Sequence, residues 1–306
     1  MKVFVLAPNE NWILDRIANE WAVECPEMTT TDYNKADVIW LVSSFSWRKM
    51  PAKILEEKKV VATIHHVVVS KFTKESLREF LARDKFVDAY HVPCQKTKEV
   101  ISQITMKPIH VIGYWYNDEI WNPTDKNNAR ETLGLQRDKF IVGSFQRDTE
   151  GHDLKSPKLE KGPDLFFDYV NNNFDKENTI VLLGGWRRQY IINRLEIAGI
   201  EYKYFEMAPL EKLKTMYAAC DLYVVSSRVE GGPQAILESA AMKVPIVSTD
   251  VGMAAAVLND NCIFNVGEQH YEPTGADVEE NYQRVSEFEL KSHVKKYKKM
   301  LEDTLS

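Results

Sequence analysis

Short apolar runs rich in β-branched residues alternate with amphipathic stretches along the first third of the chain. The apolar runs lie at residues 3–7, 38–42, 60–65, 89–92 and 109–112. Between them, residues 12–22 and 74–83 show the spacing of a helix with one apolar face. Strands that alternate with helices predict a parallel sheet covered on both faces. We therefore expect a Rossmann-like domain here.

A second series of the same kind follows a break in the apolar pattern. Residues 113–135 carry Pro123 and paired asparagines, which is typical of a linker that leads into a short helix. Further apolar runs stand at residues 140–144, 179–183, 201–205, 221–225, 245–248 and 262–264. The sequence thus predicts two Rossmann-like α/β domains facing a central cleft at the carboxyl ends of their strands, where open sheets bind ligands.

The chain becomes helical again after residue 279. Four apolar side chains there recur at the spacing of one helix face, namely Phe288, Val294, Tyr297 and Leu301. This pattern predicts a C-terminal helix that packs back on the first domain. We assign residues 1–120 together with 284–306 to the first domain and residues 121–283 to the second.

Composition narrows the class of protein. The 306 residues suffice for two domains with a core each, and 44% hydrophobic with 27% charged residues is typical of a soluble globular protein. A net charge of −6 argues against general nucleic-acid binding, which needs a basic surface. Four cysteines lack metal-ligand spacing, and the N-terminal apolar run is too short for a signal peptide. We expect free thiols, no membrane span and a cytoplasmic location.

The C-terminal helix carries a cluster of positive charge. Its members are Lys291, Lys295, Lys296, Lys298 and Lys299. Such a cluster can contact an anionic membrane surface, but it is more often the solvated face of a helix. We favour the solvated face and keep peripheral membrane contact as the alternative.

The strongest functional pattern of the chain lies in the segment SSRVEGGPQAILESAAMKVPIVSTD. Glu230 follows a predicted strand, and Glu238 lies about two helical turns further on, roughly 12 Å along the helix axis. Gly231 and Gly232 let a ligand approach the backbone, and Pro233 suits the first position of a helix. Because the N–H groups that open a helix bind phosphate, the segment predicts a site for a phosphorylated sugar.

This segment and its surroundings resemble the donor domain of family 4 glycosyltransferases, which are retaining enzymes of the GT-B fold. The family's paired glutamates match Glu230 and Glu238 in EGGPQAILE, and the continuation AAMKVPIVSTDVG is also similar. The passage VIGYWYNDEIWNPTDKNNARETLGLQRDKFIVGSFQRD resembles the family's interdomain passage and first donor-domain strand. The resemblance implies a metal-independent, hexosyltransferase-like enzyme without a cofactor.

The resemblance also assigns donor contacts. Glu238 would bond the ribose hydroxyls, which carboxylates accept well, and Glu230 would contact the donor sugar. The backbone nearby would hold sugar and phosphate, at Gly231, Gly232, Pro233 and Gln234. Glu206 and Met207 stand in the stretch YKYFEMAPLEKLKTMYAACDLYVVSS, which resembles the one that frames the nucleotide base.

A basic pair would hold the diphosphate, and the resemblance places it at Arg147 and Lys161. Two cations stabilise the charge that a leaving diphosphate develops where no metal is present. The loop between them, RDTEGHDLKSPKLEKG, is longer than in the family, so Lys155 or Lys158 are the alternatives to Lys161. Lys161 precedes a glycine and a predicted helix, which is the closer match.

In the first domain, VVATIHHVV places two histidines at the end of a predicted strand. Family members commonly have a histidine there in contact with the donor sugar. Strand alternation turns only one of the pair toward the cleft. We assign the role to His65, with His66 as its competitor.

The loop after the first strand departs from the family, because it has no glycine. Its residues Asn9, Glu10, Asn11 and Trp12 are candidates for acceptor contact. The indole of Trp12 offers a face on which sugars stack, but it equally suits the apolar start of a helix. Acceptor recognition thus rests on the part of the chain that is least similar to the family.

The sequence as a whole favours a retaining glycosyltransferase that moves a sugar from a nucleotide-diphosphate donor to a saccharide or lipid-linked acceptor. The nucleotide base, the sugar and the acceptor stay open. Two alternatives share the donor site: a GT-B sugar-nucleotide epimerase, and a protein that binds a nucleotide sugar without turning it over.

Overall fold

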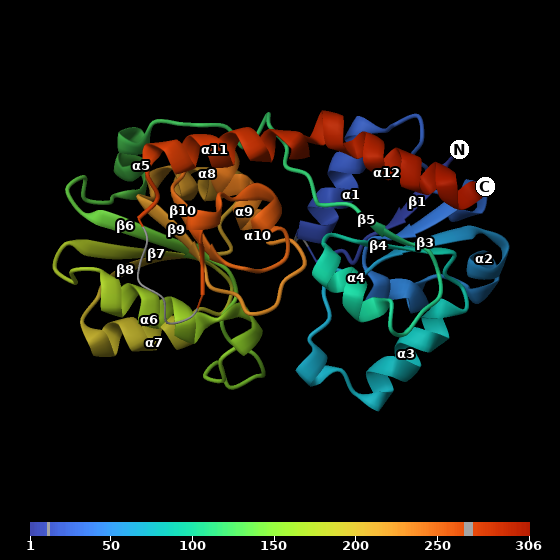
Figure 1. Ribbon diagram of the computed structural model, residues 1–306, viewed down its shortest axis with the longest axis horizontal. Coiled ribbons are helices and arrows are strands. Elements are labelled where there is room, and N and C mark those ends of the chain that lie inside the picture. The colour runs from blue at the N-terminus through green and yellow to red at the C-terminus, as the bar shows by residue number, and fades with distance from the viewer. Residues whose placement is uncertain (11–12, 266–271) are drawn as a thin grey trace. The chain divides into compact units, whose positions relative to one another are not determined.

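The computed structural model describes residues 1–10, 13–265 and 272–306, and the chain divides into two compact units (Figure 1). The first unit comprises Met1–Trp115 with Leu290–Ser306, and the second comprises Tyr116–Glu289. The unit boundaries therefore differ by a few residues from the 120/121 and 283/284 positions expected from sequence. The Tyr116 N–H donates to the Phe288 carbonyl at 3.0 Å, which joins the two ends of the second unit.

The first unit is built on a parallel five-stranded sheet in the order β1-β2-β3-β4-β5. The strands are β1 (Val3–Leu6), β2 (Val38–Leu41), β3 (Lys59–Thr63), β4 (Ala89–Val92) and β5 (Ile109–Val111). The helices are α1 (Ile13–Glu24), α2 (Ala52–Glu57), α3 (Lys74–Asp84), α4 (Gln95–Ile101) and α12 (Leu290–Leu305). A bridge from Val3 to Thr29 adds pairing on the free edge of β1. The five strands themselves follow one another across the sheet in chain order.

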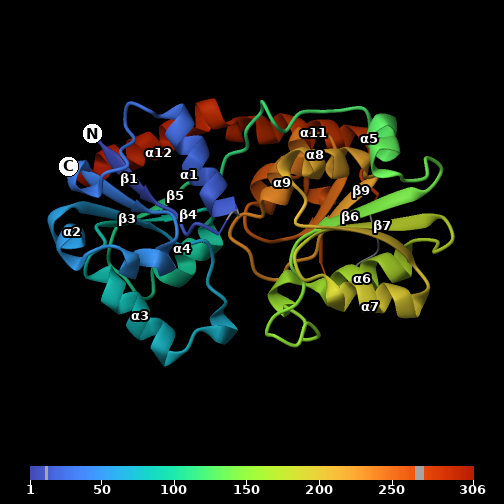
Figure 2. The ribbon, with the colours of Figure 1, turned by 180° about the vertical axis from the view of Figure 1, so that it is seen from behind.

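The pleat of this sheet sends alternate side chains to two different cores. Ile39, Val60 and Tyr90 face the core that also contains Leu55 of α2 and Phe80 of α3. The opposite face lies under α1 and α12, which Figures 1 and 2 show side by side on the sheet. The apolar runs at β2, β3 and β4 thus form strands that are almost completely buried, whereas β5 at the edge of the sheet is only half-buried.

Aromatic contacts under α1 and α12 fix the C-terminal helix in the first unit. The ring centroid of Trp40 lies 5.4 Å from that of Trp21 and 5.5 Å from that of Tyr297. The Tyr297 hydroxyl and His293 Nε2 both reach the Gly113 carbonyl, at 3.0 and 2.8 Å. The expected packing of this helix on the first domain is thereby confirmed.

The apolar and basic faces of α12 are clearly separated. Val294, Tyr297 and Leu301 are buried as expected, whereas Phe288 belongs to the preceding 3-10 turn (Ser286–Phe288) and is half-buried. Of the lysines, Lys298 lies 3.3 Å from Glu27 and is half-buried. The exposed members are Lys291, Lys295, Lys296 and Lys299.

The second unit contains a parallel six-stranded sheet in the order β11-β10-β9-β6-β7-β8. Its strands are β6 (Phe140–Phe145), β7 (Thr179–Gly185), β8 (Glu201–Glu206), β9 (Leu222–Val225), β10 (Ile246–Thr249) and β11 (Ile263–Phe264). The helices are α5 (Lys126–Leu133), α6 (Pro163–Asn173), α7 (Gln189–Ala198), α8 (Leu210–Ala219), α9 (Gln234–Ala241), α10 (Ala254–Val257) and α11 (Gly275–Val285). The winding reverses between β6 and β9, the two strands that meet at the centre.

Helices cover both faces of this second sheet. Figure 1 shows α6 and α7 on one face, and α5, α8, α9 and α11 on the other. Phe166 and Val170 of α6 and Leu195 of α7 share a core with Val142 and Val181 of the strands. The sequence supplies these contacts through its alternation of apolar strands with amphipathic helices.

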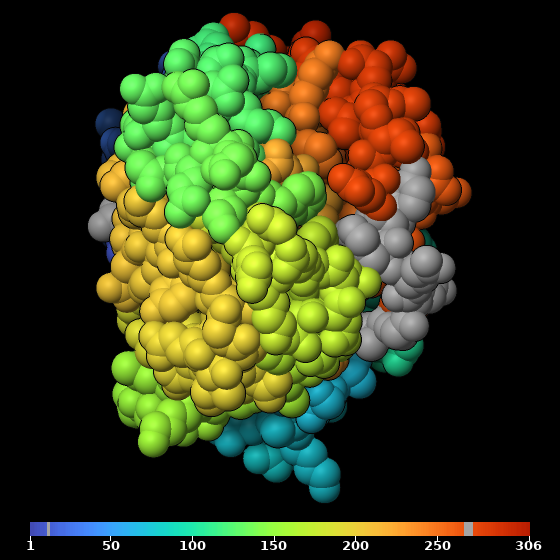
Figure 3. Space-filling model, turned by 90° about the vertical axis from the view of Figure 1, so that its left-hand side faces the viewer, coloured from blue at the N-terminus to red at the C-terminus, as the bar shows by residue number. Residues whose placement is uncertain are grey.

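The short helix α5 is tied to the edge strand β8. Figure 3 shows the green segment with α5 directly above the gold segment with β8. Lys203 of β8 donates to the carbonyls of Leu133 and Gly134 at the end of α5, the latter at 3.1 Å. The carbonyls that close this helix are thus satisfied by a cation, which the helix dipole favours.

Two further expectations concern thiols and membrane spans. The four cysteines are free and buried, namely Cys25, Cys94, Cys220 and Cys262. Within the described ranges, every helix is too short or too polar to span a bilayer.

We expect the buried histidine His91 to make stability depend on pH. Its ring is fully buried, with Nδ1 at 3.0 Å from Thr63 Oγ1 and Nε2 at 2.8 Å from the Ile112 carbonyl. Burial lowers the pKa of His91 to about 3. The unfolded chain takes up the proton near pH 6.5, so this stabilisation is complete above pH 6.5 and is lost as the pH falls toward 3.

Urea unfolding between pH 7 and 5 would measure this effect. The free energy of unfolding of the wild type should fall more steeply than that of His91→Gln, by about 1.4 kcal/mol per pH unit below 6.5. Parallel curves for the two proteins would contradict the assignment.

Candidate functional site

The candidate site lies at the carboxyl ends of β6 and β9, where the winding of the second sheet reverses. Ligands of open α/β sheets bind at such switch points, because the connections leave in opposite directions and open a crevice. Arg147 follows β6, and Glu230 follows β9. The Lys161 ammonium, from the turn before α6, forms an ion pair with the Glu230 carboxylate.

Lys161 is held in place by a close approach between two backbone segments. Gly162, at the N-cap of α6, has a φ of 60°. A Cβ at Gly162 would lie 1.8 Å from the Ser226 carbonyl oxygen, so only glycine fits there. Gln146 Nε2 also donates to the Lys161 carbonyl at 2.9 Å. The turn that carries Lys161 is therefore fixed to the ends of both β6 and β9.

The extra residues between Arg147 and Lys161 fold into a short hairpin. Thr149 bridges Pro157 in antiparallel fashion, and the Lys158 N–H donates to the Asp148 carbonyl at 2.8 Å. Because the hairpin returns to its starting point, the longer loop does not displace Lys161. Of the two alternative lysines, Lys155 is exposed on the hairpin and Lys158 lies 3.8 Å from Glu160.

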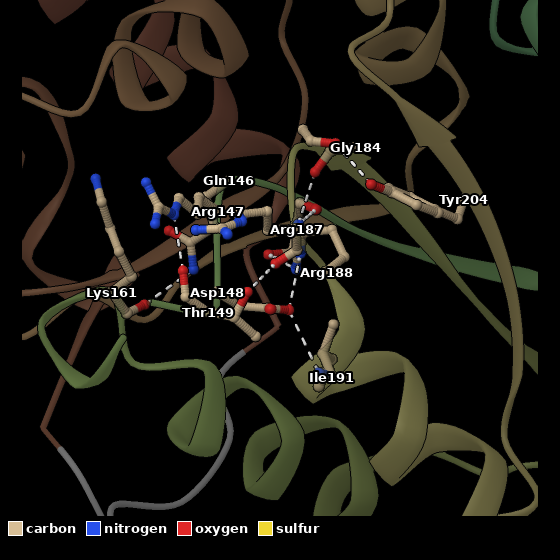
Figure 4. A network of polar contacts seen from close by, with 12 residues as sticks. Gln146, Arg147, Asp148, Thr149, Lys161, Gly184, Arg187, Arg188, Ile191 and Tyr204 are labelled. Atoms are coloured by element: carbon tan, nitrogen blue, oxygen red, sulfur yellow. Dashed lines mark hydrogen bonds and ion pairs between the residues drawn. The ribbon is translucent and has the colours of Figure 1, made fainter. Parts of the chain in front are cut away.

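Arg147 is oriented by two contacts that leave its terminal nitrogens available. Its Nε donates to the Thr149 carbonyl at 2.7 Å, and its guanidinium lies 5.1 Å from the centroid of the Trp186 ring. Figure 4 shows Arg147 and Lys161 reaching toward the same side of the loop. Over the part of the chain that the structure describes, no hydrogen bond from the Arg147 Nη atoms is found. The side chain is thus arranged for an external anion.

Behind these residues lies a buried ion pair that the sequence analysis missed (Figure 4). Arg188 Nε donates to Asp148 Oδ2 at 3.0 Å, and both side chains are almost completely buried. Arg188 also donates to the carbonyls of Ser144 in β6 and Gly184 in β7, the latter at 2.8 Å. Burial raises the pKa of Asp148, against the opposing effect of the guanidinium. The sequence did contain a signal for this pair, because a charged residue stands a few positions after each of two predicted strands: Asp148 after residues 140–144 and Arg188 after residues 179–183.

The glycine-rich turn before α9 differs slightly from expectation. Pro233 is the N-cap and Gln234 the first helical residue, whereas the sequence predicted Pro233 at the first helical position. Gly231 is buried and Gly232 half-buried. A Cβ at Gly252, in the loop after β10, would lie 2.4 Å from the Gly231 carbonyl oxygen, so the two loops pack backbone against backbone.

Glu238 lies in the body of α9 and is only 3% exposed. The Tyr217 hydroxyl donates to its Oε2 at 2.9 Å. Burial and the nearby carboxylate raise the pKa of Tyr217 well above its usual value, so this tyrosine stays a donor. The structure therefore gives Glu238 an internal partner, and its role toward ribose stays a prediction.

The expected base-framing residues stand at the end of β8. Glu206 is exposed, and Met207 is 46% exposed with a φ of 46°. Non-glycine residues rarely adopt this left-handed backbone, and such strain is concentrated at functional sites. The Met207 N–H donates to the Gly185 carbonyl at 3.3 Å, which places the ends of β7 and β8 together.

In the first unit, His65 lies two residues beyond the end of β3, so strand alternation does not decide between it and His66. The His65 ring nitrogens contact two internal groups, the Tyr114 hydroxyl and, at 2.8 Å, the Val42 carbonyl. Both histidines are half-buried. The sugar-contacting role of His65 stays a prediction.

The loop after β1 shows how the chain dispenses with glycine. Asn9 adopts a φ of 62°, a conformation that asparagine tolerates better than most residues. The Asp15 carboxylate accepts from the N–H groups of Asn9 and Glu10 at 2.9 and 2.7 Å. Both loop residues are exposed, whereas Asn11 and Trp12 lie outside the described residues.

Comparison with known proteins finds a family match within the second unit. Residues 154–276 match the family model described as glycosyl transferases group 1. The lipopolysaccharide core biosynthesis mannosyltransferase LpsB of Rhizobium meliloti (strain 1021) is 29% identical over 138 residues. That match covers 42% of this chain and spans only 37% of the length of LpsB.

Solved structures extend the similarity to nearly the whole chain. The structure of Anabaena Alr3699/HepE in complex with UDP and glucose gives a TM-score of 0.77 at 14% identity, over 98% of this chain and 99% of that one. The structure of WaaG, a glycosyltransferase involved in lipopolysaccharide biosynthesis, gives 0.61 at 13% identity, over 99% and 95%. The expected GT-B fold is confirmed, and the family match agrees with the resemblance to glycosyltransferases. Membership of family 4 stays a prediction.

We expect the Arg188–Asp148 pair to be essential for stability. Arg188→Leu leaves the Asp148 carboxylate buried without its cation, which should lower the free energy of unfolding by about 3–5 kcal/mol. The exposed pair Arg137–Glu131 is the matched control, and Arg137→Ala should cost about 0–1 kcal/mol. Urea denaturation measures both. Equal effects of the two substitutions would contradict the importance of the buried pair.

Proposed function

We propose that this protein is a retaining, metal-independent glycosyltransferase that transfers a sugar from a nucleoside-diphosphate donor to a hydroxyl group. The observation that carries this proposal is the placement of Arg147 beside the Lys161–Glu230 pair at the switch point of the second sheet. Lys161 and Glu230 both fall in the segment that matches the group 1 family model. The two cations and the turn that opens α9 support binding of the donor at this position.

The chemistry needs charge stabilisation above all. As the bond between the anomeric carbon and the diphosphate oxygen breaks, negative charge grows on the leaving group. Arg147 and Lys161 supply two cations for it, and the N–H groups that open α9 supply further donors. The acceptor oxygen bonds to the anomeric carbon on the same face, and its proton passes to the departing phosphate oxygen.

The glutamates orient the donor in this proposal. Glu230 binds sugar hydroxyls and is not a nucleophile. Glu238 anchors the ribose, held by Tyr217. Glu206 and Met207 frame the base through their backbone. Because similar structures are described in complex with UDP and UDP-glucose, a UDP-sugar is the first donor to test.

Acceptor and location are finer parts of the proposal. We place acceptor contacts at the loop after β1, the strand whose outer edge carries the bridge from Val3 to Thr29. The exposed lysines of α12 would suit a lipid-linked acceptor on the anionic cytoplasmic face of a membrane. An epimerase or a non-catalytic binding protein would share the donor site but would form no new glycosidic bond.

The first test follows donor binding and turnover together. A thermal-shift panel of nucleotides and nucleotide sugars identifies the donor, because a ligand of the native state raises the melting temperature. Arg147→Ala and Lys161→Ala should then lower turnover by about 10²- to 10³-fold each. Lys176→Ala is the control and should retain wild-type rates. Lys176 is exposed and precedes the amino-terminal end of β7, opposite to the strand ends that carry the site.

The outcomes separate the proposal from its alternatives. Inverted sugar stereochemistry without transfer would indicate an epimerase, and binding without turnover of any donor would indicate a binding protein. Wild-type rates in both arginine and lysine variants would contradict the assignment of the diphosphate site.

A second test concerns His65. His65→Ala should lower turnover by at least about tenfold while sparing nucleotide binding, because the residue is proposed to act on the sugar and not on the nucleotide. Its two internal contacts require a stability control, so the melting temperatures of His65→Ala and His65→Gln should be compared. Unchanged turnover in a folded His65→Ala protein would end the catalytic role.

A further inference from the structure

An exposed tryptophan shares its ring with two arginines at the carboxyl ends of β6 and β7. Trp186 directly follows β7 and is 46% exposed. The guanidinium carbons of Arg147 and Arg187 lie 5.1 and 4.7 Å from the centroid of its ring. Two like charges repel each other, and the negative face of an indole offsets part of that repulsion.

A buried residue, Thr149, contacts both arginines. Its carbonyl accepts from Arg147 Nε at 2.7 Å, and its hydroxyl donates to the Arg187 carbonyl at 3.1 Å. Arg187 itself has a φ of 60°, which is costly for a residue with a side chain. The hairpin that begins at Thr149 thus holds both arginines: it holds Arg147 by its side chain and Arg187 by its backbone carbonyl.

The terminal nitrogens of these arginines are available to a ligand. In the described ranges, the Arg187 side chain makes no hydrogen bond or ion pair, and Arg147 uses only its Nε. Guanidinium groups bind phosphate through two parallel N–H donors. Figure 4 shows both arginines at the strand ends, near Lys161.

We propose that Trp186 is a positioning residue that holds Arg147 and Arg187 as paired cations of a subsite for the donor diphosphate. Arg187 is then a third cation beside Arg147 and Lys161. This inference rests on the proposed function, because it names further residues of the same site. The ring contributes by fixing where the guanidiniums stand, and the phosphate oxygens meet the arginines rather than the indole.

Three probes distinguish this role from stacking of the nucleotide base. Calorimetric titrations would use UDP, uridine and inorganic pyrophosphate with the wild type, Trp186→Leu and Trp186→Phe. Trp186→Leu should weaken UDP and pyrophosphate binding by roughly three- to tenfold and leave uridine binding unchanged. Trp186→Phe should recover part of the loss, because phenylalanine keeps an aromatic face.

A matched control removes a similar contact that joins the helices α6 and α7. Arg194 lies 5.4 Å from the ring of Phe167 on α6, and Phe167→Leu should leave the affinity for all three probes unchanged. A double variant of Trp186→Leu with Arg147→Ala should bind pyrophosphate no more weakly than Arg147→Ala with Arg187→Ala. If the loss of pyrophosphate affinity from Trp186→Leu simply adds to the losses from Arg147→Ala and Arg187→Ala, the positioning role is overturned.

The remaining outcomes are also decisive. Loss of uridine binding in Trp186→Leu would assign the ring to the base, and unchanged binding of UDP and pyrophosphate would leave it without a role. Wild-type protein that binds neither UDP nor pyrophosphate would overturn the anion subsite itself. Wild-type protein that binds pyrophosphate but transfers sugar from no donor would contradict the proposed function and leave the subsite intact.

Discussion

The carboxylate of Asp148 and the guanidinium of Arg188 meet in the interior of the second unit, where solvent does not reach them. Removing two charges from water costs several kcal/mol per ion, and it is offset only when the pair also satisfies its other hydrogen bonds. Arg188 meets its part of this condition by donating to one carbonyl of β6 and one of β7, and the Ile191 N–H donates to Asp148 Oδ2. Among the described residues, Asp148 Oδ1 has no hydrogen-bond partner, so part of the cost of burying the carboxylate remains. The ends of the two strands are thus joined by a side chain in addition to the sheet ladder. Every proposed cation except Lys161 stands directly beside this pair in sequence, at Arg147 or Arg187.

The arrangement concentrates positive charge in a protein whose net charge is −6. Arg147 and Lys161, from the connection between β6 and α6, and Arg187, from the connection between β7 and α7, stand at the carboxyl ends of the strands of the second sheet. Like charges are brought together there at a cost in folding free energy, and each is compensated differently: by an indole face, by the Glu230 carboxylate, or by a buried threonine. A bound diphosphate would relieve the repulsion that remains, so ligand and cations stabilise each other.

The sequence predicted most of the fold because parallel α/β sheets leave a strong periodic signal. The strands at residues 140–144, 179–183 and 221–225 were recovered closely as β6, β7 and β9. The sequence also predicted the turn at Lys161 and Gly162, where only glycine fits, but it did not predict the ion pair of Lys161 with Glu230.

What the sequence could not supply were contacts between loops. The partner of Arg188 is separated from it by forty positions, and no periodicity links the two. Strand alternation also failed at His65, because β3 ends before it and the backbone there follows no pleat. The sequence showed the segment after Arg147 only as a loop with extra residues. Its fold into a hairpin, with the bridge from Thr149 to Pro157, depends on contacts with the rest of the unit. Contacts with other segments of the same chain, rather than local propensity, decide the conformation of such segments.

The hairpin between Arg147 and Lys161 starts and finishes at nearly the same place, because Asp148 accepts a hydrogen bond from Lys158. The entropy of closing a loop between two fixed points grows only with the logarithm of its length. Residues can therefore be added to or removed from the tip of this hairpin at small thermodynamic cost, without moving either cation. The same site could thus carry loops of very different size, and the length of this loop is a poor guide to whether a chain has kept its donor chemistry.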